Sequence, residues 1–193
     1  IEKNSITSGY NGILLNGQNV IHSPGINING NLLSGQYNYG IYLDDADAPL
    51  IQNNIITNTN QTLYYGIYLL DCNNDLKILK NKVTNFQTNG GIVINSCIGT
   101  ISKKGLIANN FVEVNGTSAA YGIYTYLSDY QNIFYNSVRI NSTSTTGGIA
   151  FYNFSGSSID VRNNILSNFG GGYAYYTNSI TAVTVSDYND LFT

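Results

Sequence analysis

Five aspartates lie close together in the sequence, and their carboxyl groups could act as one site. They are Asp44, Asp45, Asp47, Asp71 and Asp75. Asp45 and Asp71 each come five residues after the glycine of a Gly-Ile-Tyr-Leu segment. If the two segments are neighbouring strands of one sheet, these two carboxyl groups lie about 5 Å apart. The group could then bind Ca²⁺, which takes roughly six to eight oxygen ligands, or act as a carboxylate pair in glycoside hydrolysis. A solvated acidic loop is the simplest alternative.

Six tyrosines flank the same kind of segment. Three precede the glycine and three follow the isoleucine: Tyr39, Tyr65 and Tyr121, and Tyr42, Tyr68 and Tyr124. Because side chains alternate along a strand, the tyrosine after each inward isoleucine should face outward. An exposed aromatic ladder could contact the sugar rings of a polysaccharide. Tyrosine also favours strands and gains from same-face neighbours, so a purely structural row is the alternative.

Two cysteines occupy matching positions, six residues after two of the repeat glycines. They are Cys72 and Cys97, and the corresponding places in flanking segments hold Ala46 and Ser128. Stacking would place their Cα atoms about 4.8 Å apart, at the short end of the range for a disulfide. We expect buried free thiols at a position that takes small inward residues, with a disulfide as the alternative. Metal or nucleophilic use is disfavoured because the single histidine, His22, falls two repeats away.

These residues are placed by an internal repeat of the form aliphatic-x-x-Asn-x-aliphatic. Its asparagines are Asn4, Asn31, Asn54, Asn81, Asn110, Asn136, Asn164 and, in an imperfect copy, Asn189. They recur every 23 to 29 residues. A Gly-aliphatic marker follows with the same step, at Gly12, Gly40, Gly66, Gly91, Gly122, Gly148 and Gly172. Two markers that keep phase through the chain establish a repeat protein.

Within each repeat, apolar residues alternate with the period of a strand, and turn residues bound every short run. No helical period appears, so folds that alternate strands with helices are excluded. A coil of about 26 residues accommodates three short strands and three turns, and coils stacked at about 4.8 Å bury one continuous core. The sequence therefore predicts an all-β, right-handed, single-stranded parallel β-helix of about seven coils over residues 1–193, on the order of 34 Å long.

The repeated asparagine and glycine have mechanical explanations. An asparagine at the bend between two strands can bond to backbone groups of its own and neighbouring coils, and stacked copies form an asparagine ladder. The glycine before the second strand is expected to adopt a backbone angle closed to other residues.

The pattern I-x-x-N-x-I followed by G-I-x-L resembles the right-handed β-helix repeats of the pectate-lyase-like superfamily, over essentially the whole chain. Residues 132–138 and 160–165 are also similar to segments of very large secreted bacterial surface proteins. That superfamily includes lyases, glycosidases, adhesins and plain stalks, so the resemblance implies the fold and leaves the function open. Its lyases pair calcium-binding acids with a basic proton abstractor on one sheet. This sequence departs from them, because no Lys or Arg lies in phase with the acids on neighbouring coils.

Composition narrows the function classes. Only 10% of the 193 residues are charged, and the formal net charge is −3. Lys103-Lys104 is the only adjacent basic pair, which disfavours nucleic acid as a partner. No apolar run approaches the roughly 20 residues of a membrane span. Two cysteines cannot form a disulfide scaffold or a four-ligand zinc site. The chain opens at Ile1 inside a repeat, which suggests a segment of a longer protein.

We therefore expect a single β-helix domain that serves as a non-catalytic structural or adhesive module, a stalk or fibre segment at a bacterial cell surface or outside the cell. The alternative is a carbohydrate-binding or polysaccharide-degrading domain. The expected partners are flanking coils of the parent chain or other copies arranged end to end, and polysaccharide. No cofactor is expected, apart from Ca²⁺ as the one ion that the acids could hold.

Overall fold

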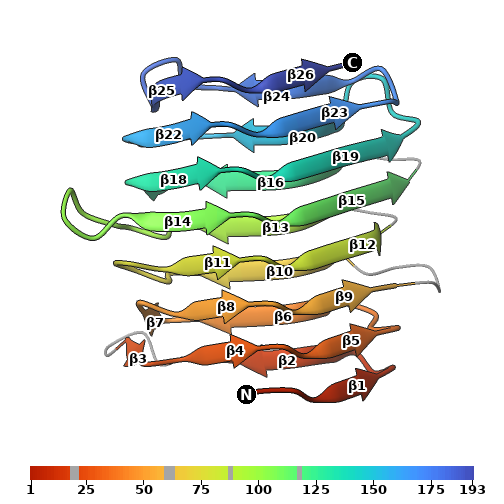
Figure 1. The fold of residues 1–193 in the computed structure, drawn as a ribbon, viewed down its shortest axis with the longest axis vertical. Coiled ribbons are helices and arrows are strands. Elements are labelled where there is room, and N and C mark those ends of the chain that lie inside the picture. Colours follow the sequence, from red (N-terminus) through yellow and green to blue (C-terminus); the bar gives the residue numbers. More distant parts are fainter. Residues whose placement is uncertain (18–21, 59–63, 87–88, 117–118) are drawn as a thin grey trace.

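The computed structural model describes residues 1–17, 22–58, 64–86, 89–116 and 119–193. The chain winds into a parallel β-solenoid whose coils stack along one axis, with the two termini at opposite ends (Figure 1). Three long sheets form its walls, and each runs the length of the stack. The predicted all-β architecture of about seven coils with several short strands per coil is confirmed.

The strands of the three sheets follow one another around each coil. Sheet A consists of β4 (Asn27–Asn29), β8 (Leu50–Gln52), β11 (Lys77–Leu79), β14 (Gly105–Ala108), β18 (Gln131–Phe134), β22 (Ile159–Arg162) and β25 (Val183–Asp187). Sheet B consists of β1 (Ser5–Thr7), β5 (Leu32–Ser34), β9 (Ile55–Thr57), β12 (Lys82–Phe86), β15 (Phe111–Gly116), β19 (Ser137–Ser142), β23 (Ile165–Asn168) and β26 (Asp190–Phe192). Sheet C consists of β2 (Asn11–Leu15), β6 (Tyr39–Asp44), β10 (Tyr65–Leu70), β13 (Asn89–Asn95), β16 (Ala120–Tyr126), β20 (Gly148–Asn153) and β24 (Tyr173–Thr177).

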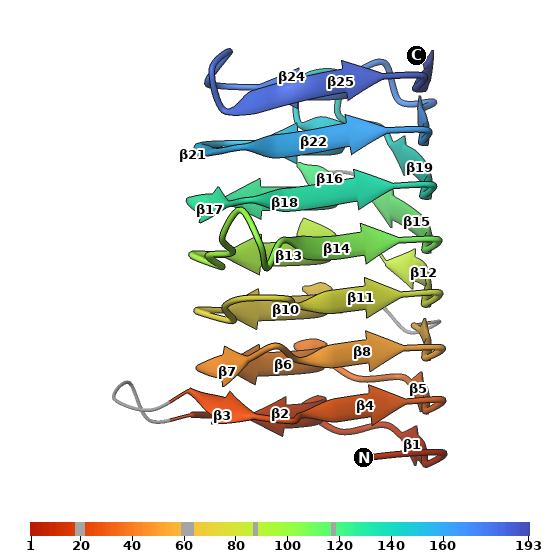
Figure 2. The same ribbon diagram turned by 60° about the vertical axis from the view of Figure 1, so that its left-hand side comes forward.

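Two short strand pairs lie where the chain passes from sheet C to sheet A (Figure 2). One joins β3 (Ser23–Pro24) to β7 (Ala46–Asp47), and the other joins β17 (Ser128–Asp129) to β21 (Gly156–Ser157). The described part of the chain holds no helix of the length and apolarity needed to cross a membrane.

Inward aliphatic side chains form continuous rows along the axis. The row of sheet A comprises Ile28, Ile51, Ile78, Ile107, Ile133 and Val161, all fully buried. The strand register aligns Ile41, Ile67, Ile92 and Ile123 in a second row on sheet C. Each such residue contributes about 1.5–3 kcal/mol on burial, so these rows make a large favourable contribution to folding.

The asparagines of the repeat line up inside the bend between sheets A and B. Each gives its backbone N–H and its side-chain Nδ2–H to Oδ1 of the asparagine on the next coil, as in the bonds from Asn81 to Asn110, at 2.9 and 3.1 Å. From Asn31 onward, each Nδ2 also donates to a carbonyl of the preceding coil, such as Ile51 O for Asn81, at 3.0 Å. The bonds run without a break from Asn4 to Asn189.

The residue before each ladder asparagine adopts the left-handed conformation. These residues are Lys3, Gly30, Asn53, Lys80, Asn109, Tyr135, Asn163 and Tyr188, with φ between 52° and 67°. One left-handed residue turns the chain sharply enough for the asparagine to sit inside the corner. The position tolerates lysine and tyrosine because their side chains point away from the rod.

The repeat glycines are required by space, and the expected special backbone angle is wrong. Gly40 and Gly122 have φ outside the left-handed region. A Cβ on Gly40 would lie 2.6 Å from the carbonyl oxygen of Gly66 and 2.6 Å from Cγ2 of Ile56. The glycines therefore leave room for two close contacts. One is with the backbone of the next strand of sheet C, and the other is with side chains of sheet B.

The last two glycine markers are also out of register with the others. Sheet C pairs Ile123 with Phe151, and Phe151 with Tyr175. Gly148 and Gly172 consequently stand two residues earlier along their strands than Gly122 does on β16. The spacing rule fails here because Phe151 and Tyr175, and not the residues directly after Gly148 and Gly172, pair in line with Ile123.

Candidate functional site

The acidic cluster lies at the corner where sheet C ends. Asp44 is the last residue of β6, Asp45 follows it, and Asp71 follows β10. The register pairs Asp44 with Leu70, so Asp45 and Asp71 hold equivalent positions on adjacent coils. Both have left-handed backbones, with φ of 54° and 47°. The spacing from the repeat glycines predicted this juxtaposition.

Carboxylate oxygens of Asp44, Asp45 and Asp71 all lie within 4.8 Å of one another. Asp45 is only 3% exposed, and its side chain lies against Gly17, where any Cβ would collide with it. Within the described residues, its Oδ2 is buried without a hydrogen-bond partner. Burial, followed by the charge of Asp45, raises the pKa of Asp44, although the hydroxyl of Tyr42 donates to that carboxylate at 3.4 Å.

The other two candidate acids have separate partners. Asp47 accepts a hydrogen bond from the side-chain amide of Asn74. Asp75 pairs with Lys77, with 2.7 Å between Oδ2 and Nζ. The structure thus brings three of the five aspartates together, whereas Asp47 pairs with Asn74 of the next coil and Asp75 pairs with Lys77 of its own coil.

His22 also reaches the cluster, which sequence reasoning missed. Its Nδ1 lies 3.8 Å from Oδ1 of Asp45, and its Nε2 lies 3.2 Å from Nδ2 of Asn73. Counting repeats placed this histidine two coils from Cys72, yet it contacts the residue next to that cysteine. The pairing of β3 with β7 places Ser23, which directly follows His22, beside Ala46 on the next coil. Among the described residues, three carboxyl groups therefore face one another with one imidazole beside them, and the three carboxyl groups are the kind of oxygen ligand that a hard divalent cation takes.

The predicted tyrosines form outward columns on sheet C. The ring of Tyr39 stacks on that of Tyr65, with 5.6 Å between centroids and 12° between planes. Tyr42 and Tyr68 stack in the same way, at 5.8 Å and 9°. In such columns the faces of the rings cover one another, so mainly ring edges and hydroxyl groups meet the solvent.

One coil interrupts the tyrosine columns. Gly90 pairs with both Tyr65 and Tyr121, and Val93 pairs with both Tyr68 and Tyr124. Val93 is 2% exposed, so neighbouring groups cover it. The tyrosines are thereby divided into a lower and an upper block.

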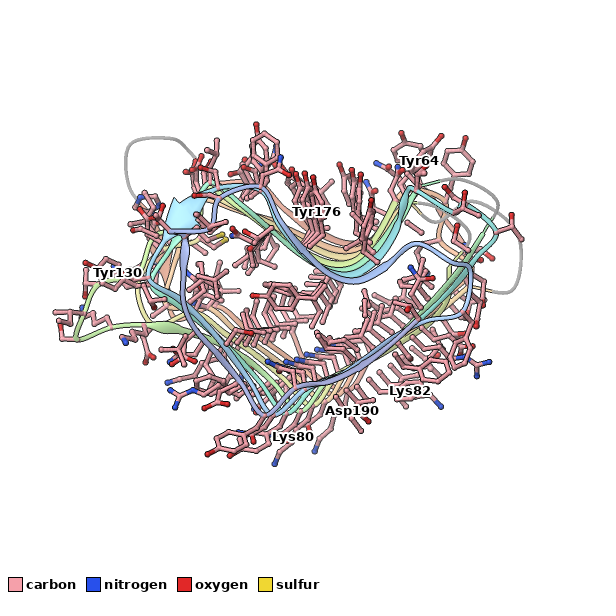
Figure 3. All side chains as sticks on the ribbon, turned by 90° about the horizontal axis from the view of Figure 1, so that it is seen from above. Tyr64, Lys80, Lys82, Tyr130, Tyr176 and Asp190 are labelled. Atoms are coloured by element: carbon pink, nitrogen blue, oxygen red, sulfur yellow. The ribbon has the colours of Figure 1, made fainter. Side chains whose placement is uncertain are left out.

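The upper block extends beyond the predicted residues. Tyr152 stacks on Tyr124, at 4.7 Å and 4°, and Tyr176 follows on Tyr152 at 5.4 Å. These rings escaped the sequence analysis because the marker Gly148 is two residues out of register. Figure 3 shows Tyr176 on the outside of this face, with Lys80, Lys82 and Asp190 on the opposite side of the rod.

The tyrosine face should make the protein sensitive to base. Burial raises the pKa of Tyr65 and of Tyr124, and the neighbouring rings Tyr68 and Tyr152 raise them further. In the unfolded chain these phenols ionise at about pH 10, whereas in the folded chain they keep their protons to higher pH. Stability is therefore fully present below about pH 10 and falls as the pH rises beyond it. Phenolate absorbance and circular dichroism, recorded together during a base titration, should show that the last phenolates form in the same cooperative step in which the fold is lost; completion of phenolate formation in the folded protein would contradict this.

A family comparison agrees with this geometry. A family described as a right-handed beta helix region matches residues 1–103 of the 193. The chain belongs to the right-handed β-helix family. Comparison with curated proteins and with solved structures gave no match. Beyond residue 103 the β-helix continues with the same sheets and the same asparagine ladder, to Asn189.

Both cysteines of the β-helix are fully buried and free. The Cys72 thiol lies 3.3 Å from the carbonyl oxygen of Leu70, and the Cys97 thiol lies 3.4 Å from that of Asn95. Burial raises the pKa of Cys97 well above its usual value, and a hydrogen bond with Cys72 adds to the effect. Ala46 and Ser128 are buried in the flanking coils, as the spacing predicted.

We expect both thiols to be inert in the folded β-helix. The thiolate is the reactive form, and it is disfavoured in an apolar interior. A thiol reagent such as DTNB should react with no cysteine under native conditions and with two after denaturation in urea. Prompt reaction of one thiol in the native protein would show that the corner opens.

A shallow apolar hollow lies on the outer face of sheet B and was not predicted. Phe111 and Ile165 flank the smaller Ser137, and Arg139 lies 5.0 Å from the ring of Phe169. The only signal in the sequence is the residue after each ladder asparagine, which alternates between large apolar and small polar side chains in these coils.

Proposed function

We propose that this β-helix is a non-catalytic structural module of an extracellular or cell-surface protein, a segment of a stalk or fibre. The observation that carries the proposal is the unbroken asparagine ladder, which accompanies three sheets along the whole rod. Such a repeat array holds length and shape through nearest-neighbour contacts. The continuous outer wall, with acids and tyrosines on the same few coils, suits display of side chains along a rod.

The ladder also suggests what lies at the ends of the rod. Because each asparagine donates to the next, the ladder has a direction, and Asn189 is its last acceptor. A further coil of the same repeat could accept hydrogen bonds from Asn189, and another could donate to Asn4. We infer that the neighbours are such coils, supplied by flanking sequence or by other copies arranged end to end.

The gene that encodes the chain gives a direct test. We expect the open reading frame to contain further β-helix repeats, a secretion signal and a surface-sorting or anchoring segment. A cytoplasmic protein with a catalytic domain built on these coils would overturn the proposal. For end-to-end contact, light scattering of the 193-residue chain should show association that rises with concentration and falls when Leu191, 52% exposed on the last strand, is changed to Asp.

A second candidate function is contact with polysaccharide along the tyrosine face. The observation that favours it is the pair of aromatic columns formed by Tyr39, Tyr42, Tyr65 and Tyr68, with Tyr121 and Tyr124 beyond the interrupting coil. Since the ring faces are covered, a glycan would meet phenol edges and hydroxyl groups, which can donate and accept hydrogen bonds.

Affinity electrophoresis in gels that contain bacterial polysaccharides tests this contact. Changing Tyr42, Tyr68 and Tyr124 to Ala should abolish retardation, and changing them to Phe should also abolish it, because the hydroxyl groups are lost while the stacks remain. Tyr135→Ala, at an exposed tyrosine of the asparagine bend, is the matched control and should bind normally. Unchanged retardation of the alanine variant would exclude the face.

A further inference from the structure

We propose that Asp44, Asp45 and Asp71 bind one calcium ion that fastens the coil of β6 to the coil of β10. Their carboxylate oxygens already lie within 4.8 Å of one another, with no rearrangement of the corner. The alternative, a solvated acidic loop without an ion, would explain Asp44 and Asp71, which are partly exposed. It does not account for Asp45, which is buried with one oxygen that has no hydrogen-bond partner among the described residues.

A buried carboxylate normally has paired, hydrogen-bonded oxygens, because leaving one unsatisfied costs about 1–3 kcal/mol or more for a charged group. Gly17 creates the recess that receives Asp45, since any side chain there would occupy its place. The recess therefore holds the carboxyl group of Asp45 beside those of Asp44 and Asp71, and one cation could contact all three. The proposal is independent of the stalk function, because it needs only this corner.

Among the described residues, His22 is the one basic side chain within ion-pair distance of these carboxylates, at 3.8 Å from Asp45. Asn73 fixes its tautomer. The side-chain oxygen of Asn73 accepts the N–H of Ile98 at 2.7 Å, so its amide nitrogen faces His22 and donates to Nε2. Nδ1 then carries the hydrogen and cannot be a metal ligand.

The remaining donors are all carboxylate oxygens, up to six if each aspartate is bidentate. Calcium takes roughly six to eight oxygens in flexible geometry, whereas magnesium demands a nearly ideal octahedron and keeps its water. With three carboxylates and water to complete the shell, we expect a dissociation constant on the order of 10⁻⁴–10⁻³ M, the range of extracellular calcium modules.

Terbium luminescence offers a direct measurement on the full 193-residue chain. The sequence has no tryptophan, and the hydroxyl of Tyr42 contacts Asp44 at 3.4 Å, so tyrosine excitation should sensitise a terbium ion at this corner. We expect saturable emission from one ion per chain that calcium displaces and magnesium displaces poorly. Tyr42→Phe should reduce the emission, which would identify the ring that sensitises the ion.

Two variants and a control decide the assignment. Asp45→Asn should weaken calcium binding at least ten-fold, and Asp71→Asn, at a more exposed position, should weaken it without affecting folding. Asp190→Asn, an exposed acid on the opposite side of the rod, should bind as the wild type does (Figure 3). Calcium should raise the melting temperature of the wild type but not of Asp45→Asn. Absence of saturable binding, or equal affinity in Asp71→Asn and the wild type, would overturn the site.

Discussion

Replacement of Asn110 by alanine should lower the free energy of unfolding by about 3–5 kcal/mol, because buried hydrogen-bonding groups would lose their partners. The backbone N–H and Nδ2 of Asn81 donate to Oδ1 of Asn110 at 2.9 and 3.1 Å. Nδ2 of Asn110 itself donates to the carbonyl of Ile78 at 2.9 Å and to Asn136 at 3.0 Å. Alanine removes all of these bonds and leaves the N–H of Asn81 buried, where water cannot replace the acceptor.

Urea denaturation followed by circular dichroism measures the change. Asn132→Ala, at an outward asparagine of β18, is the matched control and should cost less than about 1 kcal/mol. Asn110→Asp separates the contributions, since it keeps an oxygen for Asn81 but loses the donor to Ile78. If Asn110→Ala and Asn132→Ala were equally stable, the hydrogen bonds of the ladder would not stabilise the β-helix.

The asparagine ladder shows why so much of this fold can be predicted from sequence. Each coil repeats one backbone path, so a residue that is needed for the bend recurs at nearly constant spacing, and the spacing alone aligns Asn54, Asn81 and Asn110. The pairing of Asp45 with Asp71 follows for the same reason, because both are counted from equivalent glycines on strands of equal length.

Prediction fails where a connection changes length. The stretch between β2 and β3 is longer in sequence than the stretch between β6 and β7 or between β16 and β17, so counting repeats could not bring His22 to Asp45. The marker Gly148 failed for another reason. Phe151, and not Ile149, pairs with Ile123, so the Gly-Ile pair stands two residues early on β20 and Tyr152 was missed with it. The burial of Asp45 depends on the absence of a side chain at Gly17, which no pattern of apolar residues reveals.

The sequence alone also could not show why the repeat needs its glycines, since a glycine can be required either for an unusual backbone angle or for close packing. At Gly122 the structure decides for packing. A Cβ there would lie 2.5 Å from the backbone oxygen of Ala150 on the next coil and well inside 3.0 Å of Cγ1 of Val138. Neither neighbour is the far end of a flexible side chain, so the coils themselves would have to move.

Gly122→Ala should therefore destabilise the rod by about 3 kcal/mol, the upper part of the range for overpacked cores. Gly25→Ala provides the contrast. Gly25 has φ of +71° and nothing within 4 Å of an added Cβ, so alanine there meets only the left-handed backbone penalty of about 1–2 kcal/mol. The two variants separate a glycine kept for space from a glycine kept for backbone angle.

A double-mutant cycle distinguishes the two collisions at Gly122. Val138→Ala removes the side-chain collision but leaves the carbonyl of Ala150 in place, so the cost of Gly122→Ala should be smaller in the Val138→Ala background without reaching zero. Urea unfolding of the four proteins gives the coupling energy. If Gly122→Ala cost nothing in the Val138→Ala background, the contact with Val138 between sheets B and C would be the whole reason for the glycine. If its cost were unchanged, the contact with Ala150 on the next coil would be the whole reason. Parallel strands cannot separate at one residue without losing their neighbouring hydrogen bonds. We therefore expect the contact with Ala150 on the next coil to cause the larger part of the destabilisation.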